Sequence, residues 1–277
     1  MDKIDLHVHT TASDGTMSPR DVTSLAAMFG LKAIALTDHD TMAGIDEAGE
    51  AGALLGVTIV PGIEISTDYQ GREVHVLGYF LDHKSPKLQS YVDWVRQQRL
   101  DRLEKIAEKL QKKGFDVNLE EILAAHPDAT PGRPHLAQRL VELGAAENVK
   151  EAFRKYLGEG RSCYVPRKYI SFSDAARLIT ECGGVCVLAH PLQYGFDRQK
   201  LDGLVKTAAQ LGFKGIEIYY SGYTENDIKK LFDLAEKYGL LPTGGSDFHG
   251  ENKPDISLGG VTVPAYMLLM LAKSQYS

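Results

Sequence analysis

Short apolar runs alternate with amphipathic stretches along most of the chain. Apolar runs of three to eight residues between polar or glycine-containing segments predict strands, here at 4–9, 33–37, 58–65, 74–80, 185–189, 215–220 and 241–243. Several are almost continuously apolar, as are parallel strands that are buried on both faces. Helical patterns lie between them, and they begin at Ser18-Pro19, Ser173 and Thr224 and end at Gly30, Gly183 and Gly239. This alternation predicts an α/β fold.

Residues 85–161 interrupt the alternation with long polar amphipathic stretches and no strand pattern. The stretches include residues 88–113 and a second one that begins at Pro134 and ends at Leu143. We therefore expect a helical subdomain at residues 85–161, inserted into an α/β domain formed by residues 1–84 and 162–277. No internal repeat or linker-like segment is visible, so we expect the two α/β parts to close into one barrel.

Composition narrows the class of protein. The 277 residues are 43% hydrophobic and 25% charged, with 27 glycines and 11 prolines, which excludes a disordered, collagen-like or low-complexity chain. A chain of this size buries enough surface to fold without a structural metal, so any bound metal would serve chemistry. The net charge of −6 provides no overall positive field for long duplex nucleic acid. An anionic substrate would therefore need a local source of positive charge.

The chain carries no pattern of secretion or membrane insertion. Its three cysteines, Cys163, Cys182 and Cys186, form no disulfide or metal-binding spacing pattern. The first residues lack a signal-peptide pattern, and no apolar run approaches the roughly 18 residues of a membrane span. We expect a cytoplasmic protein that does not contact a membrane, and the sequence leaves its oligomeric state open.

Six of the nine histidines lie at or beside the ends of predicted strands, each with a carboxylate nearby. His7 and His9 end the first strand, and strand alternation places both imidazoles on one face, as two ligands of one ion require. Active sites of barrels form at the carboxyl ends of strands. The candidate ligands at these positions are His7, His9, Asp14, His39, Glu64, His75, His190, Asp247 and His249.

A single His-x-His pair in a strand is more often a partly buried polar pair than a metal site. Six histidines and three carboxylates at strand ends would, however, be costly to bury without partners. The combination therefore favours a metal cluster. His83 and His126 lie in polar surroundings and are expected to be ordinary surface residues.

Taken together, these residues resemble the polymerase and histidinol phosphatase (PHP) superfamily over nearly the whole chain. The resemblance implies a distorted (β/α)7 TIM-like barrel with up to three divalent metal ions at the strand carboxyl ends. It implies one ion at His7, His9, Glu64 and Asp247, a second at Glu64, His75 and His190, and a third at Asp14, His39 and His249. Imidazole and carboxylate ligands without thiolate fit Mn, Fe or Zn.

The helical insert, Arg133-Pro134-His135 and Leu188-Ala189-His190-Pro191 most resemble phosphoesterases that act on nucleoside 3′,5′-bisphosphates such as pAp and on 5′ ends of short RNA. Three divalent ions and three carboxylates would leave a charge of about plus three for a phosphate. Because water between two ions ionises near pH ~7, the resemblance implies attack by metal-bound hydroxide, with Glu64, His190 and Asp247 as catalytic residues. A histidinol-phosphate-type phosphatase and a non-catalytic metal-bound module are the alternatives.

Other residues are candidates for substrate contacts. Arg133, His135 and Lys168 are expected to bind phosphate, although an exposed helix start or a solvated lysine would have the same sequence. Tyr194 or Tyr220 could stack on a nucleobase or simply pack.

Two further points concern residues beside the expected ligands. Asp38 or Asp40 could orient His39, and Asp40 could equally cap a helix. Gln193 stands where similar proteins usually have a basic residue, so a cation for a phosphate at that place would have to come from Arg198 or Lys200.

Overall fold

The computed structural model describes residues 3–125 and 132–276 and divides into two compact units. One unit comprises the chain up to residue 89 and from residue 169 onward, and the other comprises residues 90–168. The sequence placed these boundaries at 84/85 and 161/162. The first boundary falls later because helix α3 (Pro86–Gln111) begins in the first unit and continues into the second.

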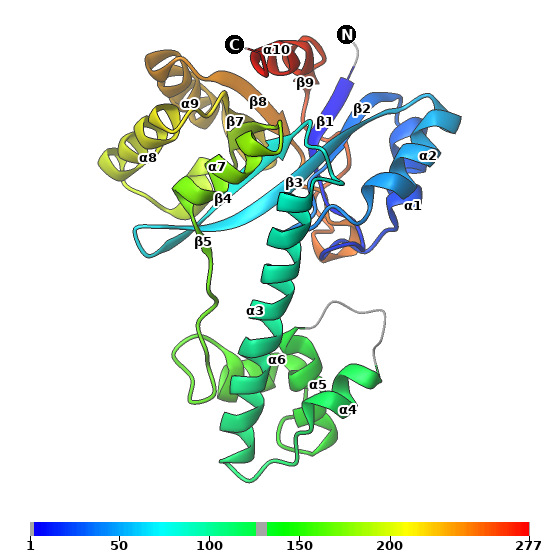
Figure 1. Cartoon of the computed structure of the whole chain (residues 1–277), viewed down its shortest axis with the longest axis vertical. Coiled ribbons are helices and arrows are strands. Elements are labelled where there is room, and N and C mark those ends of the chain that lie inside the picture. The colour runs from blue at the N-terminus through cyan, green and yellow to red at the C-terminus, as the bar shows by residue number, and fades with distance from the viewer. Residues whose placement is uncertain (1–2, 126–131, 277) are drawn as a thin grey trace. The chain divides into compact units, whose positions relative to one another are not determined.

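Within the described residues of the first unit, seven strands form a nearly closed ring (Figure 1), which confirms the barrel of the α/β class. In ring order they are β8 (Leu241–Gly245), β7 (Gly215–Tyr220), β6 (Val185–Leu188), β4 (Arg72–Tyr79), β3 (Thr58–Tyr69), β2 (Leu31–Leu36) and β1 (Lys3–Val8). Two short strands are peripheral: β5 (Ile170–Ser171) pairs with β3, and β9 (Val263–Pro264) pairs with β1.

The ring closes where the chain leaving β8 meets β1. The Asp247 N–H donates to the His7 carbonyl and the His9 N–H donates to the Phe248 carbonyl, both at 2.9 Å. Close approach requires Gly245, because a Cβ at this position would lie 2.4 Å from the His7 backbone nitrogen. The closure places His7 and His9 beside Asp247.

Strand β4 makes the barrel depart from a regular all-parallel arrangement. It runs antiparallel to both β3 and β6, whereas the other pairs within the ring are parallel. A tight turn at Gln70-Gly71, with φ of 55° and 79°, joins β3 to β4. Because β4 runs in the opposite direction, its first half lies beside the second half of β3, and His75 pairs with Ser66.

Helices cover the outside of the ring (Figure 1). They are α1 (Pro19–Met28), α2 (Ile45–Leu55), α7 (Phe172–Glu181), α8 (Arg198–Gln210) and α9 (Glu225–Tyr238), with short 3₁₀ turns at Pro191–Tyr194 and Gly250–Asn252, and a further helix, α10 (Tyr266–Ser274), follows β9. Ser18 and Thr224 cap α1 and α9 as expected, whereas α7 begins two residues early because Ser171, not Ser173, accepts the capping hydrogen bond from Asp174.

Apolar side chains fill the barrel toward the amino ends of its strands. Ile4, Val60, Leu77 and Val187 pack there with further residues that include Met267 and Leu271 of α10. Helix α10 lies at this end of the barrel, near the start of β1 (Figure 1). The carboxyl ends of the strands are therefore left for polar groups.

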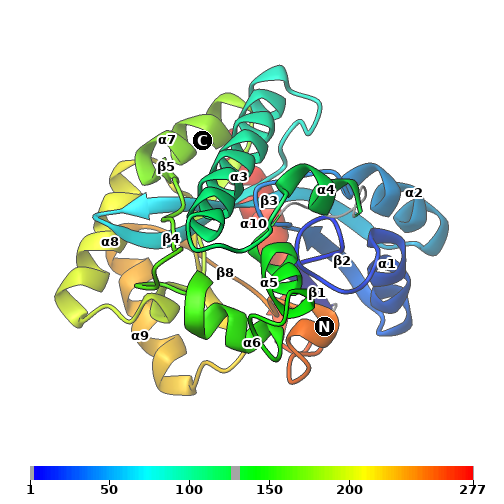
Figure 2. The ribbon, with the colours of Figure 1, turned by 90° about the horizontal axis from the view of Figure 1, so that it is seen from below.

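The second unit contains helices joined by loops and no strand within its described residues. Besides α3 it contains α4 (Leu119–Ala124), α5 (Arg133–Glu142), α6 (Val149–Ala152) and a π-helical turn at Phe153–Leu157, and α4, α5 and α6 are labelled in Figure 2. Their shared apolar core includes Leu103, Ile106, Leu110, Leu136 and Leu140. No helix in the described parts of the chain is both long and apolar enough to cross a membrane.

Candidate metal centre

Imidazoles and carboxylates converge at the carboxyl end of the barrel. His7 belongs to β1 and His9 and Asp14 follow it, while His39 follows β2. Glu64 and His75 come from the paired strands β3 and β4, and His190, Asp247 and His249 follow β6 and β8. The sequence placed Glu64 at a strand end, which is wrong, because β3 continues to Tyr69 in its hairpin with β4.

Glu64 is the centre of the cluster and is only 1% exposed. Its Oε2 lies 3.1–3.2 Å from His7 Nε2, His9 Nε2 and His39 Nδ1. Its Oε1 lies 2.9 Å from His75 Nδ1 and His190 Nε2. One buried carboxylate therefore faces five imidazoles.

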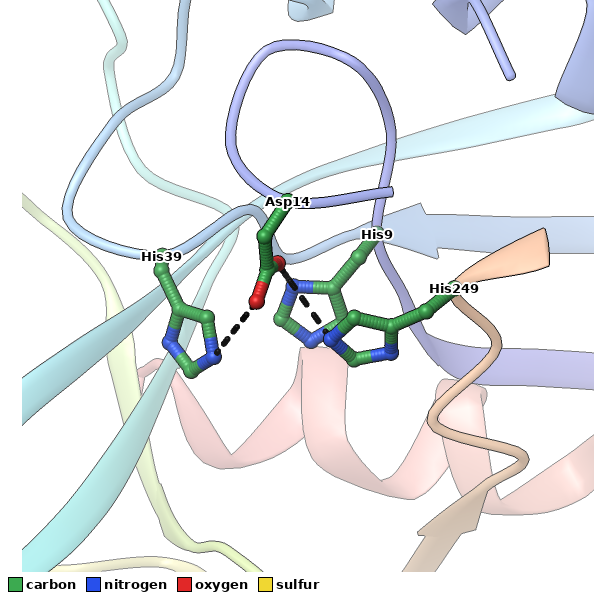
Figure 3. Close-up of side chains that lie close together, drawn as sticks. All are labelled: His9, Asp14, His39 and His249. Carbon is green, nitrogen blue, oxygen red and sulfur yellow. Dashed lines mark ion pairs between the residues drawn. The ribbon is translucent and has the colours of Figure 1, made fainter. Parts of the chain in front are cut away.

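Three groups of donor atoms, each within 4.8 Å of one another, arise from this arrangement. They are His7, His9, Glu64 and Asp247; His9, Asp14, His39 and His249; and His39, Glu64 and His75. Figure 3 shows the second group, in which Asp14 lies between His39 and His249 at 4.0 and 3.3 Å. Compared with the expected ligand sets, His9 also belongs to the Asp14 group and His39 also lies with Glu64 and His75, while His190 lies at the same Glu64 oxygen as His75.

The arrangement fits divalent cations. Buried His9 Nδ1, His39 Nδ1, His190 Nδ1 and Glu64 Oε2 make no hydrogen bond within the described structure, although such orphaned atoms are costly. His7 Nε2 and His9 Nε2 lie 3.1 Å apart. That spacing is close to the ~3.3 Å between two nitrogens bound tetrahedrally to one zinc ion.

Glu217, a fully buried carboxylate on β7, was not predicted from the sequence as part of the site. Its Oε1 lies 3.1 Å from His7 Nδ1, and its Oε2 accepts the His190 N–H at 2.8 Å. A carboxylate on the second ring nitrogen fixes the orientation of a metal-binding histidine. The feature of the sequence that could have indicated a role for Glu217 is that it is the single acidic residue within the apolar strand predicted at 215–220.

Asp38 and Asp40 hold the loops around the cluster. Asp38 accepts the Thr10 N–H at 2.7 Å and the Ser13 hydroxyl at 2.7 Å, which fixes the loop that carries Asp14. Asp40 accepts the Ser66 N–H at 3.0 Å. The capping role expected for Asp40 is wrong, because the residue that caps the next helix, α2, is Gly44.

Lys253 is a cation of the first unit that contacts the cluster, and the sequence analysis did not single it out. Asp247 turns Oδ1 toward His9 Nε2 at 3.3 Å. Its Oδ2 accepts Lys253 Nζ at 2.5 Å and the Tyr220 hydroxyl at 2.6 Å. Asp247 has a φ of 60°, a left-handed conformation that aspartate tolerates and that often marks functional sites.

Comparisons with known proteins agree with this geometry. Residues 5–159 match the model of the PHP domain. The chain belongs to the PHP family. It is 36% identical over 247 residues to a 5′-3′ exoribonuclease of Haemophilus influenzae, covering 89% of this chain and 90% of that protein. It is 33% identical to a 3′,5′-nucleoside bisphosphate phosphatase of Chromobacterium violaceum, covering 92% and 91%.

A solved structure extends the likeness to the whole fold. A candidate metal-dependent phosphoesterase of Bifidobacterium adolescentis superposes with a TM-score of 0.80 at 31% identity, covering 99% of this chain and 96% of that one. The PHP protein described here is accordingly a hydrolase of the metal-dependent phosphoesterase class, and its cluster is suited to divalent metal ions.

The charged groups of the PHP cluster shift one another's pKa values. Burial opposes charge on His9 and His75, but the neighbouring carboxylates outweigh it and raise the pKa of His9 to about 9 and of His75 to about 10. Burial lowers the pKa of His39 to about 3. For Glu64 and Asp247, burial opposes ionisation, yet the surrounding imidazoles hold the pKa of both carboxyl groups well below the usual range.

Three expected phosphate ligands belong to the second unit, and the cluster of the first unit forms without them. Arg133 and His135 lie in the first turn of α5, and Lys168 precedes β5 in a segment without regular structure. Within its unit, Arg133 donates to the Leu157 carbonyl at 3.3 Å and its guanidinium lies over the Phe153 ring at 5.3 Å. Their contacts with substrate stay a prediction.

The remaining candidates have different outcomes. Tyr194 is buried, and its hydroxyl donates to the Ala189 carbonyl and accepts the His75 N–H, both at 2.9 Å. A stacking role for Tyr194 is therefore wrong, because its ring is buried beside the rings of His190 and Phe196. His83 contacts Asp46 at 2.8 Å near the surface, and His126 lies outside the described residues.

Proposed function

We propose that this PHP protein hydrolyses a phosphate monoester of a small nucleotide, a nucleoside 3′,5′-bisphosphate such as pAp, and that it also trims short RNA from the 5′ end. The observation that carries the proposal is the cluster of six imidazoles and three carboxylates around Glu64. The names of the Chromobacterium and Haemophilus relatives support this choice of substrates.

The cluster is proposed to hold up to three divalent ions, with Mn, Fe and Zn as the candidates. The three donor groups described above would be their sites, and Glu64 belongs to two of these groups. Bound ions would supply positive charge for the phosphate and would activate water as the nucleophile near neutral pH. His190 and His75 both face Glu64 Oε1. His190 would therefore complete the ligand set that contains Glu64 and His75.

Exposure indicates the side from which substrate approaches. The side chains of Asp14, His39 and His75 are 55%, 21% and 18% exposed, whereas those of His7 and His9 are fully buried. A phosphate would therefore reach the cluster over Asp14 and His39. Glu217 holds the buried His7 in place from behind.

Several finer assignments belong to the same proposal. Lys253 would offset charge on a phosphate that lies beside Asp247, because its ammonium group is already held there. Arg133, His135 and Lys168 would bind phosphate groups from the helical unit, in the role that the sequence analysis expected. The three free cysteines support a cytoplasmic location.

The test is phosphate release from 3′-phosphoadenosine 5′-phosphate, AMP, histidinol phosphate and a short 5′-phosphorylated RNA with added Mn, together with metal analysis of the same sample. Preference for the bisphosphate with about three bound ions per chain is the expected result. Preference for histidinol phosphate would replace the proposal with a histidinol-phosphate-type phosphatase. Bound metal without turnover of any substrate would indicate a non-catalytic module.

A further inference from the structure

A surface cavity of about 730 Å³ lies in the first unit, beside the metal centre. Its lining comes from two parts of the chain. The first is residues 219–223, the end of β7 and the loop that follows it, with Ile228 of α9. The second is the segment after His249, at residues 255–257 and 260–262, with Pro264. All of these residues belong to the barrel unit.

Two contacts connect this cavity to the cluster. The Tyr220 ring lines the cavity while its hydroxyl donates to Asp247 Oδ2 at 2.6 Å. The neighbouring Ser221 also lines the cavity, and its hydroxyl donates to the Ser246 carbonyl at 2.7 Å. The cavity and the candidate metal ligands are therefore separated by about one tyrosine side chain. In a nucleotide, the ribose separates base and phosphate by a similar length.

The chemistry of the walls suits a flat, uncharged heterocycle. Tyr219, Tyr220 and Tyr223 contribute aromatic surface, and the Tyr220 and Tyr223 rings lie 5.0 Å apart at 48°. Ile228, Ile256 and Val261 contribute apolar surface. Each of the nucleobases can stack on such side chains, because every base has a flat π-face.

The charge of the walls argues against a second phosphate in this cavity. Asp255 is the charged residue among the described lining residues, and no lysine or arginine is among them. A carboxylate would repel a phosphate but would accept hydrogen bonds from a base that carries amino or ring N–H groups. Adenine, guanine and cytosine carry such groups.

We propose that this cavity binds the base of the nucleotide substrate while its phosphate lies at the metal centre. The proposal rests on the proposed function, and it adds a specificity site that favours nucleotides over other phosphate esters. Tyr223, from the loop after β7, and Ser257, from the segment after His249, both line this base site. The sequence left open whether Tyr220 stacks on a nucleobase. In this proposal Tyr220 and Tyr223 together form the aromatic surface that the base contacts.

The experiment compares kcat/KM for 3′-phosphoadenosine 5′-phosphate with kcat/KM for 1,4-anhydroribitol 3,5-bisphosphate, which has the same phosphates and no base. The metal-loaded wild-type protein should prefer the nucleotide by about tenfold or more. Ser257→Trp, which fills the cavity, should bring the ratio of the two values close to one. The same substitution at exposed Ser173, on α7 and outside the cavity, should keep the wild-type ratio.

A second pair of variants guards against misfolding of the tryptophan variant. Tyr223→Leu removes the aromatic surface and should lower the ratio of kcat/KM for the nucleotide to kcat/KM for the base-free bisphosphate. Tyr223→Phe keeps the ring, so most of the wild-type preference for the nucleotide should remain. Because the Tyr223 hydroxyl accepts the Leu192 N–H at 3.0 Å, the phenylalanine variant separates the effect of that hydrogen bond from the effect of stacking.

The outcomes separate the two proposals. Equal kcat/KM for both bisphosphates in the wild-type protein, or an unchanged ratio in Ser257→Trp, would overturn the base site while leaving the phosphatase intact. Failure to hydrolyse either bisphosphate would reject the proposed function. In that case calorimetric titration with adenosine decides: binding abolished in Ser257→Trp and kept in Ser173→Trp supports the site, and any other pattern overturns it.

Discussion

The two ends of the barrel are built from the same strands but have opposite chemistry. Along β3, Val60 packs into the apolar core and Glu64 faces five imidazoles four residues later. Along the antiparallel β4 the order is reversed, with His75 in the cluster and Tyr79 in the core. Packing at the amino ends can therefore hold the strands in place while the carboxyl ends carry groups that are costly to bury.

The strongest effect is expected from Glu64→Gln at the polar end. The amide cannot replace a carboxylate that faces five imidazoles, so metal content should fall and phosphate release should drop by about a thousandfold or more. Glu181→Gln, an exposed acid on α7, is the matched control and should behave as wild type. Full metal content and activity in Glu64→Gln would show that Glu64 is not a ligand.

Ile4→Ala disturbs the apolar end instead. Ile4 is only 1% exposed at the start of β1, so truncation should lower the free energy of unfolding by about 2–5 kcal/mol, measured by denaturant titration. Metal content of the folded variant should stay at the wild-type value, because Ile4 is not among the donor atoms. Loss of metal without loss of stability would contradict the separation between the two ends.

Glu217→Gln tests the support behind His7. The amide keeps the shape but loses the charge next to His7 Nδ1, so metal affinity should fall about 10–100-fold. Competition with a chelator measures this affinity. An unchanged affinity would assign Glu217 to the structure of the barrel alone.

Lys253→Ala tests a residue at the polar end that is not a candidate metal ligand. Removing the ammonium group beside Asp247 should lower kcat/KM about tenfold, and the metal content should change little. Lys253→Arg should recover part of the loss, whereas a lysine that merely packs would show no difference between the two variants.

The weakest effect is the pH dependence of the metal-free protein. His9 and His75 have pKa values of about 9 and about 10 in the folded state, above the value of ~6.5 expected when unfolded. Their contribution to stability is complete below pH ~6.5 and is lost as the pH rises through 9 and 10. The Tm of chelator-treated protein should therefore fall over this range. A rising or constant Tm would contradict these pKa values.

The strands of the barrel were predicted from sequence because each is a short apolar run, and α9 because Thr224 and Gly239 mark its ends. Helix α2 and the antiparallel direction of β4 were not predicted. Neither is encoded locally: the capping residue of α2 is a glycine without a side-chain cap, and apolar spacing does not specify strand direction. Glu217 was not identified because one acidic residue in a strand has many explanations.

The residue types of the site follow from the sequence alone, because six imidazoles and three carboxylates within or beside the predicted strands have few other uses. The shared face of His7 and His9 follows from it too, since strand alternation is local. The grouping of the ligands depends on the tertiary structure, because Asp14, His39 and His249 meet through ring closure between β1 and the chain after β8. Contacts between residues more than two hundred positions apart depend on how the whole sheet closes, and no local pattern specifies that.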